Sequence, residues 1–200
     1  PRANRCLFVI NELPDLQARI QVALFSILQE GEVQIRGFKM KLPLDVAFVF
    51  TANPEDYTNR GSIVTPLKDR IGSQILTHYP KTIAIAKEIT RQEAKTVVEG
   101  LFISEAARDL IEAIAFEART SEYVDAKSGV SARLSISAFE NAVSGAELRM
   151  IQNNESSSAL RVLDIMNIGP AITGKVELVY EGEQEGADFV AQELIKKAVL

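Results

Sequence analysis

A chain of 200 residues with 46% hydrophobic content is long enough to bury one substantial core or two smaller ones. Its 22 basic residues are outnumbered by 27 acidic ones, and the net charge of −5 argues against a surface devoted to nucleic acid. The apolar runs are too short to span a bilayer. Charge and apolar length together therefore indicate neither a nucleic-acid partner nor a membrane. Cys6 is the only cysteine, which excludes an internal disulfide and favours an intracellular, cytoplasmic protein.

Two short apolar runs, residues 6–10 and 46–51, each end abruptly in polar groups. Continuous runs of Val, Ile, Leu and Phe of this length predict strands that are buried on both faces of a parallel sheet. Open α/β sheets bind ligands outside the carboxyl ends of their strands, so we expect Asn11, Glu12 and Asn53 at one edge of one sheet. One carboxylate and two amides at such an edge suit a metal-bound phosphate and a water. This pattern indicates nucleotide hydrolysis.

The segment between the two strands is predicted to form a helix and a hairpin. Apolar residues recur with helical spacing over residues 15–29, and Gly31 marks the end of this helix. Alternation of apolar and polar residues over 33–42 predicts a hairpin, with Gly37-Phe38 as its two-residue turn. A helix and a hairpin inserted between two parallel strands give a mixed α/β arrangement.

After the second strand the sequence predicts a polar loop, a short helix and a third strand. The loop covers residues 54–65, and Pro66 opens the helix, since proline is tolerated in the first helical turn. Residues 68–70, Lys-Asp-Arg, are expected on this helix, and residues 73–79 are expected to form the strand. Pro80 then marks a change in the character of the chain.

Beyond Pro80 the chain is predicted to be mostly helical. Apolar spacing favours helices over the following ranges: 82–95, 104–119, 137–153, 159–168 and 188–199. The third of these is expected to begin with a capping box, Ser137-x-x-Glu140. Residues 176–180 are expected to form a short strand and residues 181–186 an acidic turn.

The polar strand ends and the short helix form an ordered set of motifs. In chain order these are the strand ending in Asn11-Glu12, the helix and hairpin, the strand ending in Thr51-Ala52-Asn53-Pro54, and the run Pro66-Leu67-Lys68-Asp69-Arg70-Ile71. This set resembles the AAA+ ATPases, and within them it is most similar to the group of the MoxR ATPases and the ATPase subunit of magnesium chelatase. The resemblance is strong over residues 5–80 and weaker up to residue 150.

The resemblance implies a fold and a domain organisation. Residues 1–80 would form the C-terminal half of a P-loop AAA+ α/β nucleotide-binding subdomain with parallel strands, and residues 81–172 an α-helical lid subdomain. Residues 173–200 are expected as a strand–helix extension. The sequence contains no Gly-x-x-x-x-Gly-Lys-Ser/Thr phosphate loop, which in this family precedes the first strand seen here. The chain is therefore expected to be a fragment that begins at the Walker B strand.

The resemblance also implies roles for the residues after the first strand. Glu12 matches the catalytic glutamate of the family, which polarises the water that attacks the terminal phosphate. Asn11 stands where the family usually has an aspartate that helps to bind Mg²⁺, so Asn11 is the expected metal-binding and cofactor-binding residue. An amide keeps an acceptor oxygen but lacks the negative charge. Either the metal is bound mainly by phosphates and the missing loop, or the site is weakened in magnesium binding or hydrolysis.

Three further residues match functional positions of the family. Asn53 corresponds to sensor 1, where an amide orients the water and contacts the γ-phosphate. Arg70 matches the arginine finger, which acts on the site of the neighbouring subunit, with Arg60 as the rival candidate. Arg133 resembles the sensor 2 arginine that contacts the nucleotide within the same subunit. The expected catalytic set is thus Glu12, Asn53 and Arg70.

For the intact protein, the resemblance implies ATP and Mg²⁺ as cofactors and a homo-oligomeric ring. The ring would remodel an unknown protein partner or insert metal into it, and the fragment alone is expected to be inactive. Two alternatives stay open. One is a catalytically weak nucleotide-sensing scaffold, because of Asn11. The other is the ATPase domain of an enhancer-binding transcription activator, which shares a helix ending similar to residues 28–32.

Overall fold

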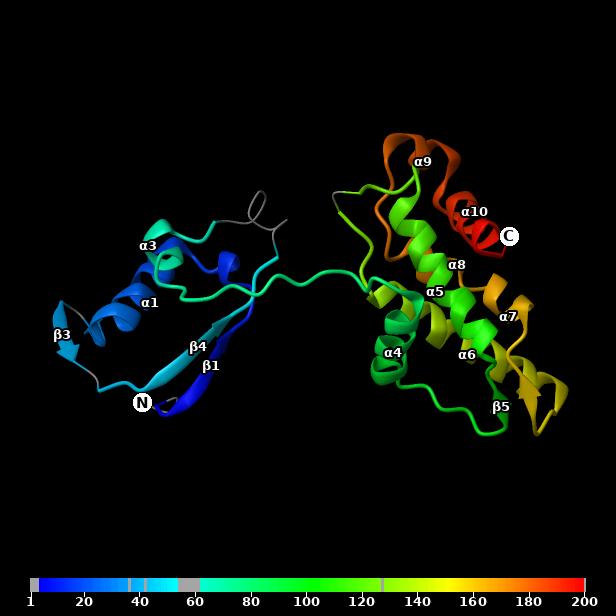
Figure 1. Ribbon diagram of the computed structural model, residues 1–200, viewed down its shortest axis with the longest axis horizontal. Coiled ribbons are helices and arrows are strands. Elements are labelled where there is room, and N and C mark those ends of the chain that lie inside the picture. Colours follow the sequence, from blue (N-terminus) through cyan, green and yellow to red (C-terminus); the bar gives the residue numbers. More distant parts are fainter. Residues whose placement is uncertain (1–3, 36, 42, 54–61, 127, 200) are drawn as a thin grey trace. The chain divides into compact units, whose positions relative to one another are not determined.

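The protein is described here by a computed structural model. It describes residues 4–35, 37–41, 43–53, 62–126 and 128–199, except for the side chains of Val33 and Gln34. The chain divides into two compact units, Pro1–Leu76 and Thr77–Leu200. Figure 1 shows that the first unit combines strands and helices, whereas the second is almost entirely helical. The fold is therefore mixed α/β, with short parallel strands and many helices.

The first unit contains a parallel strand pair. Strand β1 (Cys6–Ile10) pairs with β4 (Val46–Phe50), and the register runs from Cys6 opposite Val46 to Ile10 opposite Phe50. The predicted strands are confirmed, but their predicted burial on both faces is wrong. Leu7 is 71% exposed, because no third strand joins the pair within the described residues and their side chains meet few neighbours.

A helix and a hairpin follow β1, as predicted. Helix α1 (Ala18–Glu30) ends at Gly31, which adopts a left-handed conformation (φ 63°) and donates its N–H to Ile27. Strands β2 (Glu32–Ile35) and β3 (Phe38–Lys41) pair antiparallel. The predicted Gly37-Phe38 turn is wrong by one residue, because Phe38 already pairs with Ile35 and so belongs to the strand.

The first unit ends in a short helix and an irregular segment. Helix α3 (Thr65–Lys68) has Pro66 in its first turn, as predicted, but Arg70 lies beyond its end. Residues 73–79 form no strand, contrary to prediction. The backbone of this segment pairs with no strand among the described residues, and its apolar side chains include Ile75, which is 89% exposed.

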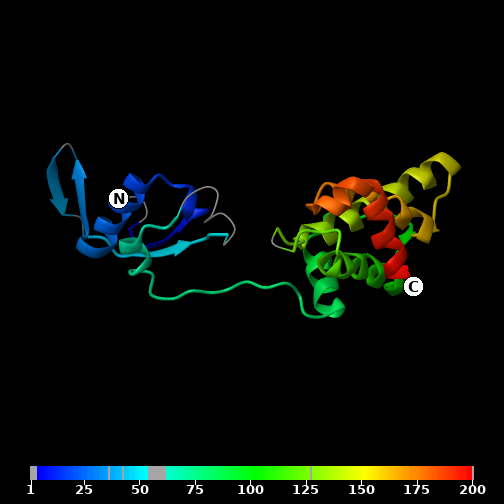
Figure 2. The same ribbon diagram turned by 90° about the horizontal axis from the view of Figure 1, so that it is seen from above.

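The second unit is built around helix α5 (Glu105–Thr120), which packs against α4 (Ile83–Glu93), α6 (Arg133–Asn153) and α10 (Ala187–Val199) (Figures 1 and 2). Its core is made of buried aliphatic side chains. The largest fully buried ones are Ile111, Ile114, Leu134, Ile165, Ile168, Ile172, Leu194 and Ile195. Among the described residues, no helix is both long enough and apolar enough to cross a membrane.

The start of α5 is confirmed, and that of α6 is not. The Ser104 hydroxyl accepts a hydrogen bond from the Ala107 N–H at 3.2 Å and so caps α5. Helix α6 begins at Arg133, four residues before the predicted start. The predicted capping box at Ser137 is therefore wrong, since Ser137 lies inside the helix. The Ser131 hydroxyl instead accepts the Arg133 N–H at 3.2 Å.

The chain after α6 is more broken than predicted. In place of one helix over 159–168, the structure has the strand β6 (Ser158–Ala159) and two short helices, α7 (Val162–Met166) and α8 (Gly169–Thr173). Strand β6 pairs in parallel with β5 (Leu101–Phe102), which removes residues 158 and 159 from any helix.

The last part of the chain belongs to the second unit. The predicted strand over 176–180 is reduced to a single bridge between Leu178 and Val124. The predicted acidic turn is a helix, α9 (Tyr180–Glu185), whose glutamates in the first turn favour a helix N-terminus. Helix α10 is confirmed and packs on α5 and α8 in the common core.

Candidate functional site at the carboxyl ends of β1 and β4

The parallel register of β1 and β4 brings two polar segments together. Ile10 pairs with Phe50, so the residues after the two strands emerge at the same end of the pair. The Thr51 N–H donates to the Ile10 carbonyl at 3.0 Å, and the Leu13 N–H donates to the Thr51 carbonyl at 2.9 Å. These backbone bonds extend the strand contact past both strand ends and place Asn11 and Glu12 beside Thr51.

The Thr51 hydroxyl bridges the two residues that follow β1. It donates to the Asn11 side-chain oxygen at 2.6 Å and accepts the Glu12 backbone N–H at 3.0 Å. One hydroxyl thus fixes the amide of Asn11 and the backbone of Glu12 at once. Sequence reasoning assigned no role to Thr51. The signal was its place as the first polar residue after an apolar strand, opposite Asn11.

Glu12 has an unusual backbone conformation. Its φ of 53° and ψ of 55° lie in the left-handed region, which costs a residue with a Cβ atom about 1–2 kcal/mol. The side chain is exposed, whereas the next residue, Leu13, is completely buried and starts a 3-10 helix (η1, Leu13–Asp15). The buried Leu13 and the Thr51 hydroxyl therefore hold Glu12 in a strained conformation with its carboxylate free to meet solvent. Strain of this kind clusters at functional sites.

Asn53 follows Thr51 by two residues at the same end of β4. Its side chain is exposed and makes no hydrogen bond to another described residue. The amide is therefore available to a ligand. The proline that follows it lies outside the described residues.

Arg70 lies two residues past α3 and close to α1. Its guanidinium carbon is 5.8 Å from the centre of the Phe25 ring, a cation–π contact. Among the described residues Arg70 forms no ion pair, so pairing with the adjacent Asp69 does not explain its position. Arg60, the rival candidate for the arginine finger, lies outside the described residues.

Arg133 belongs to the second unit, where it is the first residue of α6. Its side chain is exposed, and its backbone N–H donates to Ser131. Both features are those of a residue at a helix start, and an exposed guanidinium in the first turn remains available for an anionic group.

The donor set at the β1/β4 edge decides how a metal ion could bind there. Glu12 supplies one carboxylate and Asn11 one amide oxygen, and the described residues contain no group of three His, Cys, Asp or Glu side chains that could enclose a metal ion. Mg²⁺ usually keeps several waters and takes few protein ligands when it binds together with phosphates. The residues present therefore fit Mg²⁺ that arrives with a nucleotide, and the Asn11 side-chain oxygen is the one that would bind it.

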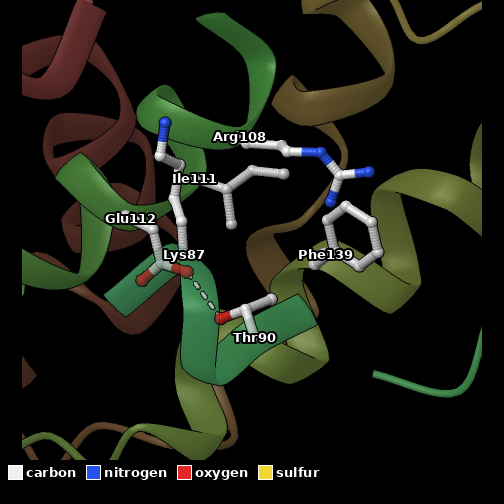
Figure 3. Close-up of a pocket in the computed structure, with 6 residues that line it drawn as sticks. All are labelled: Lys87, Thr90, Arg108, Ile111, Glu112 and Phe139. Atoms are coloured by element: carbon white, nitrogen blue, oxygen red, sulfur yellow. Dashed lines mark hydrogen bonds between the residues drawn. The ribbon is translucent and has the colours of Figure 1, made fainter. Parts of the chain in front are cut away.

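A second polar cluster lies inside the helical unit. The Thr90 hydroxyl donates to the Glu112 carboxylate at 2.5 Å, and both side chains are buried (Figure 3). The adjoining cavity has a volume of about 10 Å³ and is also lined by Lys87, Arg108 and Phe139. A pocket for a small molecule has at least about 300 Å³, so this cluster is structural.

Arg119 also serves the packing of the helical unit. Its guanidinium lies over the Tyr79 ring at 4.7 Å and the Phe116 ring at 5.1 Å, and its Nε donates to the Val130 carbonyl. Burial lowers the pKa of Arg119, while the nearby Tyr79 and Glu112 act in the opposite direction. The contact with Tyr79 attaches the first residues of the second unit to its helices.

The similarity found between this chain and known proteins lies in their structures. No family model matches the chain, and no curated protein matches it. The chain is similar to the crystal structure of a candidate ATPase from Cytophaga hutchinsonii, with 19% sequence identity and a TM-score of 0.40. The similarity covers 96% of this chain, which spans 65% of that protein's chain.

Proposed function

We propose that the protein is an AAA+ ATPase of the MoxR and magnesium-chelatase group, and that the edge formed by β1 and β4 hydrolyses ATP. The observation that carries the proposal is the Thr51 hydroxyl, which joins Asn11 to the backbone of Glu12 at the carboxyl ends of two parallel strands. This arrangement presents a carboxylate and an amide at the edge where α/β sheets bind ligands.

Each side chain at this edge has a distinct task in the proposed reaction. The Glu12 carboxylate accepts a hydrogen bond from the attacking water and orients it toward the terminal phosphate, while the Asn53 amide positions the same water. Mg²⁺, when bound with ATP, offsets the negative charge of the phosphate oxygens. Asn11 would supply a side-chain oxygen as a ligand of that ion. Phosphoryl transfer depends mainly on positioning and charge stabilisation, and the residues of this edge contribute the positioning of the attacking water.

The positively charged side chains that stabilise the phosphate groups lie outside the β1/β4 edge. Arg70 of a neighbouring subunit stabilises the transition state, because a planar, permanently charged guanidinium matches phosphate oxygens. Arg133 contacts the nucleotide from the helical unit, which acts as a lid. A homo-oligomeric ring follows from the need for Arg70 in trans. Its work on a protein partner is remodelling or metal insertion.

A second candidate function is a nucleotide-sensing scaffold with little turnover. The observation in its favour is Asn11, whose neutral amide oxygen already accepts the Thr51 hydroxyl and offers no negative charge to Mg²⁺. Such a protein would bind ATP and report its presence to a partner without hydrolysing it rapidly.

Magnesium-dependent ATP turnover by the protein expressed from its complete gene separates these functions. The Glu12→Gln variant keeps the shape of the side chain but removes the base, so turnover should fall at least about a hundredfold while ATP binding is retained. Glu30→Gln, at the exposed end of α1, is the matched control and should leave turnover unchanged. Unchanged turnover in Glu12→Gln contradicts the proposal, and tight ATP binding without turnover in the unmutated protein supports the scaffold.

A further inference from the structure

Helix α1 buries a polar residue in place of an apolar one. All of its residues are described, and Gln21 is the only one classed as buried, with 1% of its surface exposed. Neighbouring aliphatic residues such as Ile20 and Val22 are exposed. A buried amide costs stability unless its hydrogen bonds are satisfied, so a specific set of partners is required to explain Gln21.

The Gln21 amide has those partners at both ends. Its Nε2 donates to the Leu16 carbonyl at 2.9 Å and to the Ser62 carbonyl at 3.2 Å. Its Oε1 accepts the Val64 N–H at 2.9 Å. Leu16 lies just before α1, whereas Ser62 and Val64 lie more than 40 residues further along the chain. The side chain therefore joins the start of α1 to the segment that leads into α3.

The position of Val64 makes this contact consequential. Val64 occupies the N-cap position of α3, immediately before the first helical residue, so the hydrogen bond from its N–H to Gln21 fixes where that helix begins on α1. Leu67, inside α3, is completely buried and completes the contact. Arg70 follows three residues later, over the ring of Phe25. Phe25 is four residues after Gln21, so both lie on the same face of α1.

We propose that Gln21 is a positioning residue, which fixes α3 on α1 through Ser62 and Val64 and thereby places Arg70 for its action on the neighbouring subunit. The inference rests on the proposed function, because the role of Arg70 does. An aliphatic side chain could bury equal area at this position, but it would leave the Val64 N–H and the Ser62 carbonyl without these bonds. The hydrogen bonds of the Gln21 amide therefore fix the position of α3, and Arg70 follows directly after this helix.

The test uses Gln21→Met, which preserves the length of the side chain and removes its hydrogen bonds. Gln29→Met is the matched control, since Gln29 is exposed on the same helix. In the protein from the complete gene, Gln21→Met should lower kcat about ten- to a hundredfold with little change in KM for ATP, because a displaced Arg70 weakens only the transition state. Gln21→Glu keeps the acceptor for Val64 but sets a buried carboxylate against the Leu16 and Ser62 carbonyls, so it should lose at least as much activity.

Mixed oligomers assign the defect to one side of the shared site. Subunits carrying Gln21→Met should restore activity when mixed with Glu12→Gln subunits, and should not restore it when mixed with Arg70→Ala subunits. The reverse pattern overturns the proposal, because it places the effect of Gln21 on the Glu12 side. Equal kcat in Gln21→Met and Gln29→Met overturns it as well.

Amide hydrogen exchange tests the contact of Gln21 with Ser62 and Val64 independently of ATP hydrolysis. Exchange of the Val64 amide and of the amides of residues 65 and 67–70 should rise about tenfold or more in Gln21→Met and stay unchanged in Gln29→Met. If exchange rises in a protein that has no ATPase activity, the contact stands, the proposed function fails, and the inference about Arg70 fails with it. Unchanged exchange overturns the positioning role whatever the activity.

Discussion

Thr51 gives the candidate site its geometry although it carries no charge. Its hydroxyl donates one hydrogen bond, to Asn11, and accepts another, from the backbone of Glu12. The hydroxyl of a threonine can do both at once, which neither valine nor alanine can. Because Glu12 sits in a strained left-handed conformation, loss of this bond should let its backbone relax and its carboxylate move.

Replacing Thr51 tests whether the site depends on the two hydrogen bonds of its hydroxyl. Thr51→Val keeps the shape and removes the hydroxyl, so ATP turnover should fall on the order of ten- to a hundredfold while ATP binding stays close to normal. Thr51→Ser, which keeps the hydroxyl, should restore most of the activity. Thr120→Val, at the end of α5, is the control and should have no effect on turnover. Equal turnover in Thr51→Val and the unmutated protein would show that the bridge is not needed.

Residues next to strand ends could be predicted from the sequence, and their partners could not. Asn11 and Glu12 stand out because an apolar run stops before them. The contact of Thr51 with Asn11 spans 40 residues, and that of Gln21 with Val64 spans 43. Local patterns carry no information on such pairs, since they depend on the register of strands and on how helices pack.

Among the helices and strands, Arg149 fixes the segment in which β6 and α7 replace the predicted helix over 159–168. Its Nε and Nη2 donate to the two carboxylate oxygens of Asp164 at 3.1 and 2.9 Å. Nη1 donates to Glu155 and Ser158, and Nη2 also donates to the Ala159 carbonyl. All five donors of the guanidinium are thus used to attach α7 and β6 to the end of α6. A helix across 159–168 would break these bonds.

Arg149→Lys should therefore destabilise the helical unit. An ammonium group cannot reproduce the planar fork on Asp164 and the contacts to Ser158 and Ala159 at the same time. We expect Tm to fall by about 5 °C, measured by thermal unfolding. Arg91→Lys is the control, because Arg91 on α4 forms only exposed ion pairs, with Glu88 and Glu105. Equal Tm values for the two variants would contradict this role.

The same contact predicts a dependence on pH. Burial alone would raise the pKa of Asp164, but hydrogen bonds from Arg149 and from the Arg161 N–H bring that pKa below its ordinary value. A carboxyl group with a lowered pKa in the folded state stabilises the protein above the pKa of the unfolded chain, and this stabilisation is lost as the pH falls through the folded pKa. The stability advantage over Arg149→Lys should thus be full near neutral pH and shrink below about pH 4.

Helix starts with a clear cap were predictable, and elements defined by tertiary contacts were not. Thr82 and Ser104 accept N–H groups from the first turns of α4 and α5, as their sequence positions indicate. The N-cap residue of α6, Ala132, has no side chain that can cap the helix, and β6 exists only because it pairs with β5. Periodicity alone therefore placed α6 four residues late and merged β6 with the helices that follow.

At the scale of the whole molecule, the two units differ in how much they bury. The second unit has a continuous aliphatic core. Among the described residues of the first unit the buried side chains are few: Leu13, Pro14, Gln21 and Leu67. The sequence indicates which residues are apolar, but it does not indicate what covers them. For this reason β1 and β4 were predicted correctly and their burial was not, and the apolar run over 73–79 was mistaken for a strand.

In the proposed assembly of subunits, Glu12 of one subunit and Arg70 of the next serve the same ATP. The measurement is ATP turnover by Glu12→Gln and Arg70→Ala subunits, each alone and then mixed. The account predicts that neither variant is active alone and that the mixture regains turnover, because some interfaces then pair an intact Glu12 with an intact Arg70. Full activity of Arg70→Ala alone, or a mixture as inactive as its parts, would contradict it.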